Sequence, residues 1–133
     1  VPSNAPPKIT PVLKMYAPKV DADGNEMGGV PVVLLDAPLG TYLGWNVTAG
    51  GARPFHQGEI CNYVGGMVPF AQNAADRQAN NDTRLSLQER YGSHDGYVQA
   101  VQKATERAMK EGFLLPEDAQ GLIEAAQKSA VLR

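Results

Sequence analysis

The string "GSHDG", residues 92–96, contains the three side-chain types of a serine-nucleophile triad. A nucleophilic serine on a strained turn requires the pattern G-x-S-x-G, because glycine on both sides lets the backbone bend tightly enough to expose the hydroxyl. Here Ser93 directly follows Gly92, so the spacing is wrong, and no other string in the sequence fits. His94 and Asp95 also point to different sides of a helix that Ser93 is predicted to cap. We therefore expect no catalytic residue in this chain.

The other histidine, His56, lies in the sequence "RPFHQGE". Together with Glu59 it offers the groups of an acid–base site, but a general base must reach the proton of a matched nucleophile. The sequence supplies no such nucleophile, so a surface or hydrogen-bonding role is favoured. We keep His56 as a candidate at the rim of a binding pocket and assign it no catalytic role.

The string "DADGNE" resembles the start of a calcium-binding loop, in which oxygen ligands alternate as Asp21, Asp23 and Asn25 do. Such a loop also needs glycine at its sixth position and glutamate at its twelfth, where this chain has Glu26 and Val32. The Asp-Gly pair instead favours a tight hairpin turn, because glycine accepts a positive φ without steric cost. We expect this turn, with no metal and no cofactor. Calcium-dependent stabilisation is the weaker alternative.

The stretch "DAPLGTYLGWN", residues 36–46, follows the most apolar segment of the chain and carries Tyr42 and Trp45. Aromatic side chains in a glycine-rich loop either line a ligand pocket or cover a core where a strand ends, and the area that each buries favours the cover. The two glycines of "GTYLGWN" are expected to turn the chain sharply, so that both rings fold over a sheet edge or a pocket rim. Tyr42, Trp45 and His56 are therefore the candidate rim or binding residues.

The composition is that of one soluble globular domain or part of one, with 133 residues, 43% of them hydrophobic and 20% charged. A net charge of −2 gives no basic footprint for nucleic acid. No apolar run approaches the roughly 20 residues that span a bilayer, and "VPSNAPPKITP" lacks the order of a signal peptide. Cys61 is the single cysteine and has no partner for an internal disulfide. We expect no nucleic acid and no membrane span, and the compartment stays open, with a secreted or periplasmic protein compatible.

The chain changes character near residue 70, because nine of its ten prolines precede residue 71. Residues 1–70 are expected to form a β-hairpin and loops, and residues 71–133 to form helices. The segments "TPVLKMYAP" and "GGVPVVLLDAP" flank the predicted turn and are the expected strands of the hairpin. The run "VVLL" has no polar alternation, which predicts a strand covered on both faces, as inside a larger sheet.

Residues 71–133 contain several signals for helix starts and ends. Ser86 begins the capping box "SLQE", and Asn73 can cap a weaker helix that ends at Ala79. Ser93 is expected to cap a longer helix that runs from His94 to about residue 110 and stops at a glycine. Its apolar stripe comprises Tyr97, Val101, Ala104 and Ala108.

A final helix is predicted to open at Pro116, because proline is favoured at the first helical position and two acidic residues follow it. Leu122, Ile123 and Ala126 are its apolar residues. The last two predicted helices are expected to pack as an antiparallel hairpin.

Several strings, taken in order, carry a resemblance over nearly the whole chain. They are "VDADGNEMGGVPVVLLDAPLGTYLGWN", "GGMVPFAQNAADRQANNDTRLSLQERYGSHDGYVQAV" and "GFLLPEDA". They resemble the C-terminal end of the alpha/beta hydrolase domain family, with its D-x-x-G-N-x-x-G-G stretch, its T-Y-x-G-W-N loop, its P-F-A segment and its E-R-Y helix.

The resemblance implies an α/β fold completed by a longer serine hydrolase, whose nucleophile and histidine lie upstream of this chain. Residues 1–133 would then be the C-terminal segment of the domain rather than an independent catalytic domain. The implied partners are the remaining N-terminal portion of the hydrolase and a small carboxylic ester. The alternative, from another class, is a non-catalytic binding or interaction domain that uses its aromatic loop and helical hairpin to hold a partner.

Overall fold

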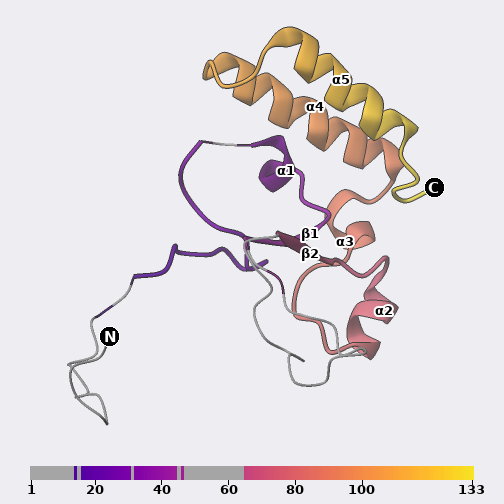
Figure 1. The fold of residues 1–133 in the computed structure, drawn as a ribbon. Coiled ribbons are helices and arrows are strands. Elements are labelled where there is room, and N and C mark those ends of the chain that lie inside the picture. The colour runs from indigo at the N-terminus through magenta and orange to yellow at the C-terminus, as the bar shows by residue number, and fades with distance from the viewer. Residues whose placement is uncertain (1–13, 15, 31, 45, 47–64) are drawn as a thin grey trace, which may run out of the picture.

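The computed structural model describes residues 14, 16–30, 32–44, 46 and 65–133 (Figure 1). Its elements follow the order α1 (Val33–Asp36), β1 (Gly40–Leu43), β2 (Gly66–Pro69), α2 (Ala74–Ala79), α3 (Leu87–Tyr91), α4 (His94–Lys110) and α5 (Pro116–Lys128). Figure 1 shows α4 and α5 side by side at one end and α2 towards the other, with the small sheet and α3 between them. Within these residues, no helix is both long and apolar enough to cross a membrane.

The predicted helical hairpin is confirmed. α4 begins after Ser93, whose hydroxyl accepts a hydrogen bond from the backbone N of Gly96 at 3.2 Å. It ends at Lys110, two positions before Gly112, which has a φ of 80° and so turns the chain as predicted. Pro116 then opens α5 at its first position. Each long helix therefore starts and stops where the sequence places its signals.

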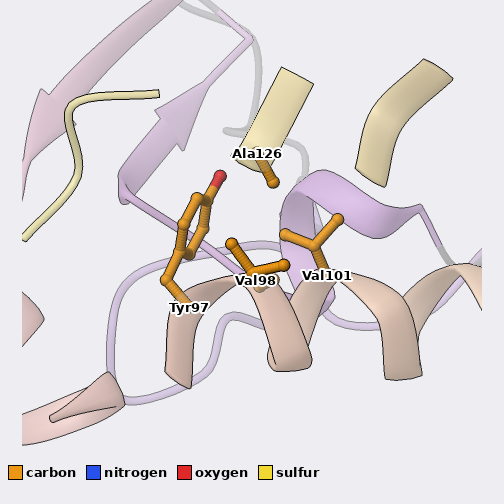
Figure 2. Packing of buried hydrophobic residues seen from close by; sticks show 5 residues of the cluster. Tyr97, Val98, Val101 and Ala126 are labelled. Atoms are coloured by element: carbon orange, nitrogen blue, oxygen red, sulfur yellow. The ribbon is translucent and has the colours of Figure 1, made fainter. Parts of the chain in front are cut away.

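The core lies along the contact of α4 with α5 and α1, and Figure 2 shows part of it. The predicted α4 stripe is buried, and small residues face it from α5, where Ala119 and Ala126 are buried. Small side chains at such a contact let two helices approach closely. Leu122, also expected on the apolar side of α5, is 40% exposed. Ile123 packs against the core, whereas Leu122 remains open to solvent.

The predicted strand at "VVLL" is wrong, because residues 33–36 form the one-turn helix α1. The backbone N of Asp36 donates to Val32 O at 3.2 Å, and that of Ala37 donates to Val33 O at 2.9 Å. A helical turn satisfies these groups internally, whereas a strand needs a neighbour to bond with. The apolar run serves α1 instead, since Val33 packs against the core beside α4.

The loop predicted for "GTYL" is also wrong, because these residues form β1 and pair antiparallel with β2. Gly40 lies opposite Pro69, and Thr41 opposite Val68. A Cβ atom on Gly40 would lie 2.9 Å from the Cα of Pro69. Gly40 is therefore needed for the close approach of two backbones and not for a turn.

The predicted turn at Asp23-Gly24 is present, with Gly24 at a φ of 80°. Of the strands expected on either side of it, residues 10–13, 15 and 31 lie outside the described residues, and the pairing in the described part is a single antiparallel bridge between Val20 and Glu26. The sheet in the described residues is built from β1 and β2 instead.

The two short helices are capped as predicted. The side chain of Asn73 accepts from Asp76 N at 2.9 Å at the start of α2. Ser86 and Glu89 form a complete capping box at the start of α3, in which each side chain accepts from the backbone N of the other. These caps fix the segment that leads from β2 into α4.

Candidate functional site

Tyr42 is half-buried in β1, and Trp45 and His56, the other rim candidates, lie outside the described residues. The Tyr42 hydroxyl accepts a hydrogen bond from Leu39 N at 3.3 Å, so the side chain contacts the segment just before its own strand. Tyr42 also borders a shallow hollow of about 220 Å³. Its position is compatible with either a cover or a pocket rim.

The side chains of "GSHDG" have partners that do not form a nucleophile–base pair. Ser93 caps α4, as described above. The ring of His94 faces two carbonyl oxygens near the C-terminus, with Nδ1 2.8 Å from Val131 O and Nε2 3.2 Å from Gln127 O. His94 therefore joins the start of α4 to the last turn of α5 and to the residues that follow it. The prediction that Ser93 is a helix cap is confirmed.

The motif D-x-x-G-N builds a turn that reaches β1. One carboxylate oxygen of Asp21 accepts from the backbone N of Asp23 and of Asn25, both at 2.9 Å. Asn25, only 1% exposed, then donates from Nδ2 to Gly40 O at 3.2 Å and accepts at Oδ1 from Tyr42 N at 2.8 Å. These oxygens of Asp21 and Asn25 are thus hydrogen-bonded within the protein, in the turn that the sequence predicts.

Two arginines surround the buried ring of Phe70, which is 3% exposed. The guanidinium carbons of Arg84 and Arg90 lie 5.1 Å and 4.5 Å from the ring centroid, within the range of cation–π attraction. Phe70 is therefore a buried packing residue between the two guanidinium groups.

Arg84 connects three parts of the chain. It contacts Asp82 through Nη2 at 2.6 Å, donates to the Thr41 hydroxyl at 2.7 Å, and reaches the backbone oxygens of Val68 at 3.0 Å and Pro69 at 3.3 Å. Hydrogen bonds from Arg84 lower the pKa of Asp82 from 3.8 to about 2. The pair therefore stays ionised at neutral pH and holds the segment before α3 against both strands.

Arg90 performs the same task from α3. Its Nη2 lies 2.7 Å from a carboxylate oxygen of Asp23, so it ties the turn to the helix. Its Nε is buried and has no acceptor in the described structure. Together with Arg84, it makes a polar network that holds the turn, the segment before α3 and α3 itself against β1 and β2. We call this network, Asp23, Asn25, Thr41, Asp82, Arg84 and Arg90, the strand clamp.

Two tyrosines line the contact between α3 and α4. The rings of Tyr91 and Tyr97 meet edge to face with their centroids 5.3 Å apart. Burial raises the pKa of both phenols, so both remain protonated at neutral pH. Tyr91 uses its proton to bond Pro38 O at 2.7 Å. These hydroxyls therefore act as neutral structural donors or packing groups rather than as acids or bases.

Two adjoining apolar cavities of about 200 Å³ and 270 Å³ open beside α1. Both are lined by Val33, Leu34 and Leu122, and the second continues to Phe113. Leu34 and Phe113 are 54% and 55% exposed. We call this surface the apolar trough. The one titratable group in its lining is the phenol of Tyr97, whose pKa burial raises and which therefore stays neutral. No cluster of metal-ligating side chains occurs in the part of the chain described.

Comparison with protein families gives the decisive result. The model of the family described as "Alpha/beta hydrolase domain" matches residues 1–124. The chain belongs to this family. No curated protein and no solved structure matches it. Its helices and short sheet are consistent with the α/β class that the family resemblance implies.

In this alpha/beta hydrolase domain protein, the strand clamp was missed by sequence reasoning. Only Asp23 and Asn25 carried a signal, as turn formers. Asp82 lies two residues from Arg84, but the links to the rest of the clamp are distant, since Thr41 is 43 residues from Arg84 and Asp23 is 67 residues from Arg90. No local spacing predicts these two links.

Proposed function

We propose that this chain is the C-terminal part of a carboxylic-ester serine hydrolase and that it completes the fold of that enzyme. The catalytic nucleophile and histidine then come from the upstream portion of the enzyme, which we call the parent hydrolase. Membership of the alpha/beta hydrolase domain family supports hydrolase chemistry. Under the proposal the chain holds no triad residue, takes no cofactor and contributes structure and surface.

One observation carries the proposal, namely the apolar trough. A monomeric soluble protein rarely leaves a large contiguous apolar surface open to water. Five large apolar side chains that line the trough are each at least 40% exposed: Val30, Val32, Leu34, Phe113 and Leu122. A packing partner from the parent hydrolase would remove this surface from water, with a gain of about 25 cal/mol per Å² of apolar area.

The proposed role of the loop after β1 is to cover the sheet or the rim of the substrate pocket. The strand clamp supports this role. Asn25 bonds the outer edge of β1, and Arg84 bonds a backbone oxygen of β2, the strand paired with it. A strand fixed in this way can position the residues that follow it, including Trp45. The substrate at that rim would be a small carboxylic ester.

The alternative is a non-catalytic binding or interaction domain. The self-contained core between α4 and α5 favours it. An independent domain is expected to place residues 30–35 in a sheet of its own. Residues 33–36 are helical instead, which counts against this alternative. The apolar trough would then bind a different partner protein.

Intact-mass analysis of the natural protein, with any co-purifying chain, tests the assignment to a parent hydrolase. We expect this sequence within, or firmly bound to, a longer polypeptide that forms an acyl-enzyme with an activated ester. A homogeneous 14.2 kDa species that folds cooperatively by itself would contradict the proposal.

A matched pair of variants tests the trough. Leu122→Asp places a charge in it and should abolish assembly with the rest of the enzyme. Gln120→Asp places the same charge on an exposed position of the same helix that does not line either cavity and should leave assembly intact. If both variants assemble equally well or equally poorly, the trough is not the surface that binds the rest of the enzyme.

Trp45→Ala in the parent hydrolase tests the cover. Loss of a buried indole should cost about 3 kcal/mol or more in stability or substrate binding, while the nucleophile keeps its chemistry. The acyl-enzyme burst separates these outcomes. A folded variant that binds substrate normally and loses the burst would make the loop part of the catalytic machinery.

A further inference from the structure

Among the described residues, the outer edge of β1 is bonded by a side chain and not by a strand. In an antiparallel pair, alternate residues direct their backbone groups towards the partner strand and away from it. Gly40 O and Tyr42 N both bond the Asn25 side chain, so both point away from β2. Asn25 donates to the residue before Thr41 and accepts from the residue after it, as one residue of a parallel neighbouring strand would.

We propose that Asn25 acts as a one-residue substitute for a neighbouring strand and closes the edge of β1 against pairing with a second copy of this chain. An unpaired edge presents free N–H and C=O groups to any extended chain and is a recognised route to association. Asn25 occupies both groups at once. Its position is fixed by the Asp21 carboxylate, which accepts from its backbone N at 2.9 Å.

The second copy is the fitting partner because the uncovered edge is self-complementary. If two β1 strands meet antiparallel about a two-fold axis at Thr41, Gly40 O of each faces Tyr42 N of the other. The two bonds lost from Asn25 are then replaced by two identical bonds between copies. The clamp by Arg84 keeps β1 extended on its other side, through the backbone oxygens of Val68 and Pro69.

The test compares Asn25→Ala with the wild type in the protein as it is naturally produced. At low concentration, the Tyr42 amide should exchange its hydrogen about five-fold faster, as loss of a single net hydrogen bond predicts. At rising concentration, sedimentation velocity should detect dimers, and the Tyr42 amide should become protected again. Wild-type protein should stay unassociated through this edge and show no such concentration dependence.

Ser86→Ala is the control for general loss of stability, since it removes the α3 cap without touching β1. If it associates as strongly as Asn25→Ala, the edge explanation fails. Asn25→Asp provides a second variant, which keeps the acceptor for Tyr42 N and loses the donor to Gly40 O. A folded Asn25→Ala or Asn25→Asp protein that stays unassociated, with its Tyr42 amide exchanging at a rate independent of concentration, would overturn the proposal.

Discussion

The guanidinium of Arg84 donates two hydrogen bonds to the carboxylate of Asp82, two residues earlier in the chain. Nη2 lies 2.6 Å from one oxygen and Nε 2.9 Å from the other. Planar arginine matches a carboxylate with two parallel bonds, which lysine cannot do. The same guanidinium also bonds the Thr41 hydroxyl at 2.7 Å. The segment before α3 is thereby fixed to the sheet.

Arg84→Lys should destabilise the protein by about 2 kcal/mol, because the partly buried Asp82 carboxylate loses its two-point contact and two backbone oxygens lose charged donors. Urea unfolding measures this loss. Arg107→Lys is the matched control, since Arg107 is 49% exposed and pairs with Asp36 at the surface. The control should cost less than about 1 kcal/mol. Equal costs would contradict the structural role of Arg84.

Acid should weaken the Arg84–Asp82 pair in a defined window. Its hydrogen bonds lower the pKa of Asp82 from 3.8 to about 2 in the folded state. The stabilisation is therefore full above the unfolded value and is lost as pH falls towards the folded value. In Asp82→Asn, the stability difference from wild type should shrink between about pH 5 and about pH 2. A pH-independent difference in urea unfolding would contradict this assignment.

Another carboxylate contributes acid sensitivity in the same window. Hydrogen bonds from Arg77 and Ser86 lower the pKa of Glu89 to about 2. Asp82→Asn should therefore remove only part of the acid dependence of wild-type stability, and Asp82→Asn with Glu89→Gln should remove more.

Ser93→Ala should cost about 1 kcal/mol of stability, as expected for loss of a helix N-cap. Its hydroxyl accepts from Gly96 N, which would be left without that partner. In the parent hydrolase the variant should retain ester hydrolysis. A folded variant with complete loss of the acyl-enzyme burst would show that Ser93 is a nucleophile as well as a helix cap.

His94→Ala should loosen the C-terminal residues without unfolding α4. The ring lies 2.8 Å from Val131 O and 3.2 Å from Gln127 O, so the variant loses both links. Hydrogen exchange should become faster at residues 129–133, while the amides in the middle of α4 keep their protection. Asp95→Asn, at the neighbouring exposed position, should leave both regions unchanged.

The sequence by itself determined the helical half of the protein. Ser86, Ser93 and Pro116 act within one turn of the helices they begin, so their effect depends on neighbours in sequence. The Asp-Gly turn is local in the same sense, since Asp21 bonds residues two and four positions later. The ordered motifs also identified the family.

Only the tertiary structure decided the first half and the strand clamp. Whether "VVLL" or "GTYL" becomes a strand depends on which segment finds a partner, and β1 finds it in β2, 23 or more residues further along the chain. A short apolar run is compatible with a strand or a buried helical turn until its neighbours are fixed. Arg84 and Arg90 acquire their roles because folding brings Thr41 and Asp23 to them from 43 and 67 residues away.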